Sequence, residues 1–397
     1  MSSSPPLDLV VTDPGSVFVH SSWTGAAHLA VGKGRLGRKA TGGHVLDGRG
    51  LIVLPAFVDS HIHGIGPFRF WGHDTHEEYV YNLAMAARRL PSHGVATFLP
   101  SSVAEGDGGA AVLRAVASVV ASPREPCAAE IVGAHAEGPF LNPDFAGAHR
   151  VEALVSPDPE AVTAFLEEFA GAIEILTAAP SLPGFAELAR EACRRGITVQ
   201  IGHDLPTLAE WRAALDSGAS GVTHLFNGMG GLHHRREDLA ALALGDPGVV
   251  CEIIVDFGFV SAAWIRVALT IAPDRLVAVS DSIGDVAAGA SFNGTALTTG
   301  EGGILVRESD GAVWSSNSTI EDAAGRLRSL GIGWGDIAKL TSQNLIRHLA
   351  RRNPAWGGRL ARPGAPANLV LVDEAAIVRA TVIEGRLAYL RDPGRLQ

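Results

Sequence analysis

The chain has 397 residues, 47% of them apolar, which is enough to bury a large core in one domain or two. Its formal net charge of −10 argues against nucleic acid or an anionic membrane as a partner, because both attract a positive surface. The N-terminus, MSSSPPLDLVV, has no basic segment before an apolar one, and no run of about 18 apolar residues occurs, so we expect a cytoplasmic protein without a membrane span.

Short β-rich runs alternate with amphipathic stretches from about residue 51 to residue 345. The predicted strands are LIVLPAFVDS (51–60), GVATFLPSS (94–102), EIVGAHAEG (130–138), IEILTAAP (173–180), ITVQIGH (197–203), GVTHLFN (221–227), VVCEIIVD (249–256) and RLVAVSDS (275–282). Apolar spacing of three to four predicts helices over 79–90, 159–169, 184–195, 207–217 and 262–271. Apolar strands separated by helices indicate parallel pairing buried on both faces. We therefore expect a (β/α)8 barrel of the TIM type, with an open doubly wound sheet as the alternative.

Both ends of the chain have a sequence pattern that differs from that of the predicted barrel. Residues 7–53 and 359–391 contain short β-like pieces divided by glycines and lack helical periodicity. We expect a small β domain assembled from residues 1–53 plus 359–397, flanking a barrel over residues 54–358.

Polar side chains gather at the C-terminal ends of the predicted barrel strands. They are His61 and His63 after the first strand, His135 and Glu137 after the third, His203 ending the fifth, His224 in the sixth and Asp281 after the eighth. Each has a structural explanation when taken singly, as a satisfied histidine, a turn residue or a cap. Strand ends of a barrel form one face, however, where active sites are built. Imidazoles and carboxylates on one face are the ligands of a divalent first-row ion, and the HxH spacing puts both imidazoles on one side of the chain.

Asp281, within AVSDSIG, has a chemical role beside such an ion. A divalent ion lowers the pKa of bound water toward neutrality. A nearby carboxylate can orient that water, take its proton and return it to a leaving amine. The pattern predicts a metal-dependent hydrolase.

Several longer motifs are spread over most of the chain. They are PAFVDSHIHG, GVATFLPS, GAHAEGPFLNPDFAGAH, AAPSLPG, GITVQIGHDLPTLAEWRAALDSGASGVTHLFNGM, VSDS and GGRLARPGAPANLVLVD. These motifs resemble the amidohydrolase superfamily, and within it the N-acetylglucosamine-6-phosphate deacetylases. HAEGPFLNP followed by GAH, and GH followed by THLFNGM, are specific to that deacetylase branch.

The resemblance implies a role for each matching position. It assigns metal binding to Glu137, His203 and His224, with His61 and His63 as a further pair that some members keep and others have lost. It assigns acid/base chemistry to Asp281, polarisation of the substrate carbonyl to His149, and substrate binding to Asn227, Gly228 and Arg235. The cofactor it implies is one or two divalent ions, zinc first and iron as the alternative. In the family the arginine reaches the phosphate from a neighbouring subunit, which implies a homodimer.

Three departures touch substrate recognition. One is IGPFRFWGHD, which follows HIHG where the family has a glycine-rich loop. VDFGFV places Phe259 where the family has a histidine that contacts substrate, and RRED replaces the RxPG around Arg235. The expected reaction is removal of an acetyl group from an N-acetylated amino sugar, N-acetylglucosamine 6-phosphate first, by attack of metal-bound hydroxide with Asp281 as acid/base. Because an aromatic ring cannot donate a hydrogen bond to a phosphate, a different, unphosphorylated N-acyl metabolite is an alternative substrate. A non-catalytic binding protein on the same scaffold is the remaining alternative.

Overall fold

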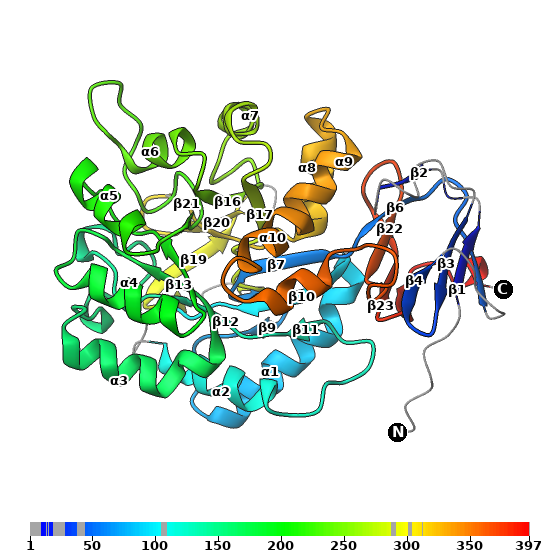
Figure 1. The fold of residues 1–397 in the computed structure, drawn as a ribbon, viewed down its shortest axis with the longest axis horizontal. Helices are drawn as coiled ribbons and strands as arrows, with labels where there is room; N and C mark the ends of the chain where they lie inside the picture. The colour runs from blue at the N-terminus through cyan, green and yellow to red at the C-terminus, as the bar shows by residue number, and fades with distance from the viewer. Residues whose placement is uncertain are drawn as a thin grey trace.

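The computed structural model describes residues 9–12, 14, 16–18, 28–37, 44–104, 109–286, 291–300, 304–311 and 313–396. A barrel of parallel strands wrapped by helices stands beside a smaller β domain (Figure 1). The first and last described strands both belong to that β domain. Within the described ranges, no helix combines the length and the apolar composition needed to cross a bilayer.

Parallel strands close into a barrel. In order around it they are β7 (Phe57–Ile62), β10 (Val95–Pro100), β12 (Ala134–Glu137), β13 (Ile173–Ala178), β14 (Thr198–Ile201), β15 (Gly221–Val222), β16 (Val250–Ile254) and β17 (Leu276–Val279). Ser101 bridges His135 between β10 and β12, and the amide of Asp281 donates to the carbonyl of His61 at 2.8 Å, which joins β17 to β7. The short β11 (Glu130–Ile131) pairs with β10 on the side away from β7. The expected barrel is confirmed, and the open doubly wound sheet is not the arrangement found.

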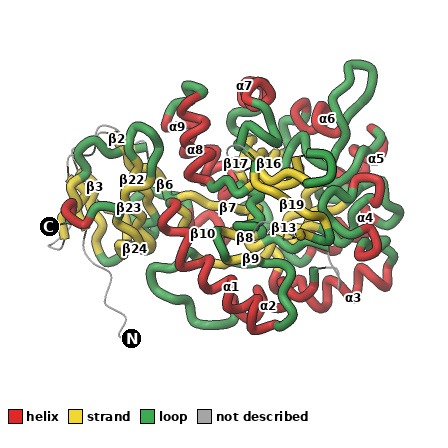
Figure 2. Tube along the Cα trace, turned by 180° about the vertical axis from the view of Figure 1, so that it is seen from behind, coloured by secondary structure: helices red, strands yellow, loops and turns green. Residues whose placement is uncertain are grey.

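Helices cover the outside of the barrel (Figure 2). They are α1 (His76–Arg89), α2 (Ala110–Val120), α3 (Pro159–Phe169), α4 (Phe185–Arg194), α5 (Leu208–Asp216), α6 (Leu239–Gly245), α7 (Ala262–Ile271), α8 (Ile320–Ser329), α9 (Trp334–Ala338) and α10 (Asn344–Leu349). Capping boxes start α1, α5 and α8, where a threonine hydroxyl and an acidic side chain three residues later satisfy free amides. The predicted helices agree to within one turn, whereas α2, α6 and α8 to α10 were not predicted.

The first predicted strand, 51–60, divides into two. Its first half, β6 (Ile52–Pro55), pairs antiparallel with β22 of the β domain. After Ala56 the chain enters the barrel, where the amide of Phe57 donates to the carbonyl of Gly94 at 2.9 Å. An apolar sequence alone does not show such a change of sheet, because both halves are buried.

The β domain contains segments from both ends of the chain, as expected. One sheet has β1 (Leu9–Thr12), β3 (His28–Gly32), β4 (Arg35–Gly37) and β5 (His44–Asp47); the other has β2 (Ser16–Val17), β6, β22 (Leu369–Val372), β23 (Val378–Ile383) and β24 (Arg386–Leu390). Apolar side chains from both sheets, including Leu29, Leu46 and Leu371, pack into one core. The domain boundary predicted at residue 53 stays a prediction, although this sheet reaches Pro55.

A four-stranded antiparallel sheet follows β17 and was not predicted. Its strands are β18 (Ser291–Phe292), β19 (Thr295–Thr299), β20 (Ile304–Arg307) and β21 (Val313–Ser316), which we call the insertion sheet. A small hairpin, β8 (Gly64–Ile65) and β9 (Phe68–Arg69), follows β7. Phe292 packs against Trp71 in one apolar cluster, and Ser316 bridges Ser282 just beyond β17. The insertion sheet therefore adjoins the carboxyl end of the barrel.

The amino end of the barrel is filled with apolar side chains. Val58, Ile175 and Val250, each near the start of its strand, pack with Leu345 and Leu349 of α10. This apolar packing fills the amino end of the barrel, whereas the buried histidines and Glu137 gather at its carboxyl end.

Candidate metal centre

Six predicted site residues meet at the carboxyl end of the barrel. His61 lies in β7, His63 follows it, Glu137 ends β12, His203 follows β14, His224 follows β15 and Asp281 follows β17. The histidines and Glu137 are at most 5% exposed. Barrel closure therefore brings together strand ends that are more than 200 residues apart in the sequence.

Glu137 stands at the centre of this group. Its Oε1 lies 3.0 Å from His203 Nε2 and 2.9 Å from His224 Nε2. The two imidazole nitrogens are themselves 3.0 Å apart. We call Glu137, His203 and His224 the first donor group.

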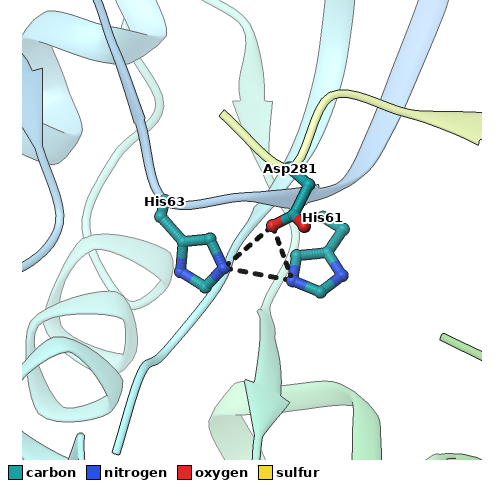
Figure 3. Close-up of side chains that lie close together, drawn as sticks. All are labelled: His61, His63 and Asp281. Atoms are coloured by element: carbon teal, nitrogen blue, oxygen red, sulfur yellow. Dashed lines mark hydrogen bonds and ion pairs between the residues drawn. The ribbon is translucent and has the colours of Figure 1, made fainter. Parts of the chain in front are cut away.

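A second donor group consists of His61, His63 and Asp281, whose side chains point toward one another (Figure 3). The Nε2 atoms of the two histidines are 3.1 Å apart. Asp281 Oδ1 lies 3.4 Å from His61 Nε2 and 3.3 Å from His63 Nε2. Glu137 reaches this group with its other oxygen, Oε2, at 3.4 Å and 3.3 Å from the same nitrogens. One carboxylate thus connects both groups.

These spacings fit a divalent metal ion. Metal–ligand bonds of about 2.0–2.2 Å place neighbouring ligand atoms roughly 3.0–3.5 Å apart. The donor atoms approach to between 2.9 and 3.4 Å, and imidazole with carboxylate is the ligand set of zinc or iron. The residues present therefore fit such a cofactor, at one position or two.

Hydrogen bonds set opposite tautomers for His203 and His149. His203 Nδ1 donates to the carbonyl of Phe145 at 2.7 Å, which leaves the Nε2 lone pair free. His149 is arranged the opposite way, because its Nδ1 accepts from the amide of Ala104 at 2.9 Å. Burial lowers the pKa of His149 to about 4, so the ring is neutral and its proton sits on Nε2. His149 thus offers a donor, 3.4 Å from Glu137 Oε2.

Both central carboxylates are held ionised. Burial alone would raise the pKa of Glu137, but His61 and the hydrogen bond that His149 donates outweigh it and place that pKa well below its ordinary value. The pKa of Asp281 is lowered in the same way, with burial opposed by His61 and His63. Asp281 is the more open of the two, with 18% of its side chain exposed against 5% for Glu137. An ionised, accessible carboxylate suits the exchange of protons with a substrate.

His135 does not join the donor groups, although the sequence pattern placed it among them. Its Nδ1 donates to the carbonyl of Ser60 at 2.9 Å, and its Nε2 meets the hydroxyl of Thr177 at 2.7 Å. It lies two residues before Glu137 on the same strand, so the side chain occupies the layer below. Strand-end position alone cannot distinguish these two layers.

A cavity of about 240 Å³ opens over the donor groups. Its lining includes His63, Glu137, His149, His203, His224, Asp281, Asn227, Gly228, Phe259, Phe292, Val313 and Trp314. The predicted substrate positions Asn227, Gly228 and Phe259 therefore do face it. Gly228 has a φ of +61°, and a Cβ there would stand 3.1 Å from His203 Nδ1, so glycine permits this close approach.

Arg235, predicted to bind substrate, lies elsewhere. It is exposed, in the loop before α6, and does not line the cavity. Sequence reasoning missed Phe292 and Trp314, which come from the insertion sheet, and Glu252, which lies inside the barrel behind His61. One signal for Glu252 was available, a single charge within the apolar strand VVCEIIVD.

The chain is similar in sequence and in fold to several known proteins. The sequence profile described as the Amidohydrolase family matches residues 52–283. The N-acetylglucosamine-6-phosphate deacetylase of Bacillus subtilis is 30% identical over 350 residues, 85% of each chain. The N-acetylgalactosamine-6-phosphate deacetylase of Escherichia coli O157:H7 is 28% identical over 353 residues, 85% of this chain and 88% of that one. The crystal structure of a Thermotoga maritima N-acetylglucosamine-6-phosphate deacetylase, 24% identical, shares the fold with a TM-score of 0.81, covering 96% of this chain and 99% of that one.

Proposed function

The chain belongs to the amidohydrolase family, and from that premise we propose that it removes the acetyl group from an N-acetylated amino sugar, with N-acetylglucosamine 6-phosphate as the first candidate. The observation that carries the proposal is the meeting of Glu137, His203 and His224 with Asp281 beneath one cavity. Relatives named for the glucosamine and galactosamine phosphates point to the same class of substrate.

Metal binding in this proposal belongs to Glu137, His203 and His224, joined by His61 and His63. A divalent ion, zinc first and iron as the alternative, supplies a Lewis acid and lowers the pKa of water when bound there. The lone pair of His203 Nε2 faces the site because Nδ1 is occupied by the Phe145 carbonyl. Glu137, ionised by its surroundings, adds the negative charge that a divalent ion requires.

Proton transfer belongs to Asp281. Its carboxylate accepts a proton from the attacking water and returns it to the departing nitrogen, which an ionised group at the cavity wall can do. His149 donates its Nε2 proton as a hydrogen bond to the acetyl carbonyl oxygen, where negative charge develops. Asp281 thus transfers the proton, and His149 stabilises the oxyanion.

Substrate binding belongs to the upper cavity. Asn227 Nδ2 and Trp314 Nε1 are buried and have no hydrogen-bond partner within the described chain, so both donors are available to sugar hydroxyl or phosphate oxygens. The aromatic surfaces of Phe259 and Phe292 supply apolar contact for the sugar ring.

A second candidate substrate is an unphosphorylated N-acyl amine. The observation that favours it is that the described residues lining the cavity include no lysine or arginine, while Phe259 forms part of the wall. A phosphate group usually receives such a cation or an imidazole. A binding protein without catalysis is less well supported, because Asp281 and all the metal-binding side chains are in place.

An acetate-release assay tests the proposal. Purified protein, loaded with Zn²⁺ or Fe²⁺, is given N-acetylglucosamine and N-acetylgalactosamine, each with and without the 6-phosphate. We expect release from the 6-phosphates first. A preference for the unphosphorylated sugars would favour the second candidate. No acetate from any of the four would contradict a deacetylase and leave the binding protein.

We also propose a cytosolic homodimer. The exposed side chain of Arg235 is available to the cavity of a second copy, and Cys127, Cys193 and Cys251 are free thiols, as expected in a reducing compartment. Light scattering should give twice the mass of the chain, and cell fractionation should place it with soluble proteins. A monomer with full activity on phosphorylated substrate would contradict a role for Arg235 across an interface.

A further inference from the structure

Glu252 is a buried carboxylate that the proposed reaction does not use. It lies in the middle of β16, where Val250 and Ile254 share its face, and its side chain is fully buried inside the barrel. It stands directly behind His61, on the side away from the cavity. An ionised side chain in such a place is costly unless a partner compensates it.

The two oxygens of Glu252 have different surroundings. Oε1 accepts from the Ser60 hydroxyl at 2.5 Å and from Gln200 Nε2 at 3.4 Å. Oε2 lies 3.6 Å from His61 Nδ1. Neither Oε2 nor His61 Nδ1 has a hydrogen bond to any other described residue. Two buried polar atoms thus face each other, a few tenths of an ångström beyond hydrogen-bond distance.

His61 is also the only ion-pair partner of Glu252 within the described part of the chain. A proton on His61 Nδ1 lies between the two groups and satisfies both. The lone pair of Nε2 then points the other way, toward His63 Nε2 at 3.1 Å and Asp281 Oδ1 at 3.4 Å (Figure 3). A carboxylate behind an imidazole in this manner fixes the ring and raises its basicity as a ligand.

We propose that Glu252 is a positioning residue that holds His61 with Nε2 free, and that it thereby lets the protein retain a second metal ion between His61, His63 and Asp281. The inference rests on the proposed metal-dependent function. The negative charge of Glu252 contributes as well, because two divalent ions carry four positive charges and the nearby Glu137 and Asp281 supply only two negative ones. Glu252 adds a third behind the ligand shell.

A purely structural role makes a different prediction. Ser60 and Gln200 could hold Glu252 as part of the polar layer that also contains Thr177, Thr223 and His135. Removing the carboxylate would then lower the stability of the whole barrel, and it would not weaken the binding of one metal ion more than that of the other. Metal stoichiometry separates the two roles.

The experiment uses the full chain and Zn²⁺ alone, without substrate. Zinc is titrated in a chelator buffer and the bound metal is measured by elemental analysis for wild type, Glu252→Met, Glu252→Gln, His61→Asn and the double variant Glu252→Met/His61→Asn. We expect wild type to bind two equivalents of zinc. Glu252→Met should retain one equivalent and bind the other about 10- to 100-fold more weakly. His61→Asn should show the same loss, and the double variant should be no worse than His61→Asn, because both changes act on one site.

Glu174→Gln is the matched control. Glu174 is a carboxylate on β13 held by Trp356 Nε1 at 2.8 Å and by Asn353, away from the donor groups. It should keep both equivalents. Glu252→Gln, which keeps the size and the bond to Ser60, covers the case in which Glu252→Met does not fold, and thermal unfolding of the metal-free proteins checks each fold.

Wild-type affinity for both ions in a folded Glu252 variant would overturn the inference. Equal weakening of both ions, or a wild type that binds only one, would do the same and leave the proposed deacetylase intact. A wild type that binds no metal and releases no acetate would instead refute the proposed function itself.

Discussion

The two sides of the cavity are built in different ways. On the metal side, every donor comes from a barrel strand or from the residues directly after one. All of them except Asp281 are buried, and each lies within 3.4 Å of another donor. On the recognition side, Phe292 and Trp314 come from the insertion sheet and Phe259 from the loop after β16. Val313, beside Trp314, is 40% exposed. Metal chemistry is thus part of the barrel itself, whereas contacts with the rest of the substrate are added to its rim, so the second can change without the first.

Replacement of Asp281 by asparagine tests the metal side most severely. Asp281 has a φ of +48°, a left-handed conformation that asparagine tolerates well, so the fold should persist. We expect kcat to fall about 10²- to 10⁴-fold, because the amide cannot accept and return a proton. Steady-state acetate release measures the loss, and elemental analysis should still find the ion held by Glu137, His203 and His224.

Two outcomes would change the role of Asp281. Loss of all metal together with activity would make its carboxylate a ligand first and a proton carrier second. Turnover equal to that of wild type would remove it from the reaction.

Replacement of Phe259 by histidine tests the recognition side. Its backbone amide donates to Asp256 Oδ1 at 2.9 Å, which fixes the main chain and leaves the side chain to line the cavity. An imidazole there offers phosphate a charge-assisted hydrogen bond of about 1.5 kcal/mol, so kcat/KM for the 6-phosphate should rise about 10-fold relative to the unphosphorylated sugar.

Phe259→Leu is the control, because it removes the ring without adding a donor. Metal content should be unchanged in both variants if the two sides are independent. No gain with histidine would show that other parts of the rim, such as the insertion sheet, exclude the phosphate.

The same division explains which parts of the fold the sequence predicted. The barrel strands are continuous apolar runs, and the motifs around His61, Glu137 and His224 carry their own chemistry, so both were found. The insertion sheet escaped notice because β19, with the sequence TALTT, buries only its central leucine and is only weakly apolar. Short polar strands of this kind resemble loops in sequence.

Contacts across the barrel could not be predicted either. Glu252 and His61 are 191 positions apart, and their approach depends on how β16 and β7 are placed when the barrel closes. The displacement of His135 to the layer below has the same origin, because depth within the barrel is set by the stagger of the strands. Residue type and spacing predict which face a side chain takes, not its depth.

The smallest expected effect concerns Trp314, on the rim. Its Nε1 is buried with no hydrogen-bond partner in the described structure, and the guanidinium of Arg307 lies 4.8 Å from its ring. Trp314→Phe keeps an aromatic ring and removes only the donor. A neutral hydrogen bond is worth about 0.5–1.5 kcal/mol, so KM should rise roughly 2- to 10-fold with kcat unchanged.

Trp334→Phe is a close control, because an arginine, Arg328, also stacks over that ring at 4.5 Å, but Trp334 lies in α9, outside the cavity lining. It should leave KM as it is. If Trp314→Phe lowered kcat and left KM alone, the rim would be acting on the chemical step, and the separation between the two sides of the cavity would fail. If KM alone changed, the barrel would supply the reaction and the insertion sheet the choice of substrate, because binding lost equally from ground state and transition state leaves kcat untouched.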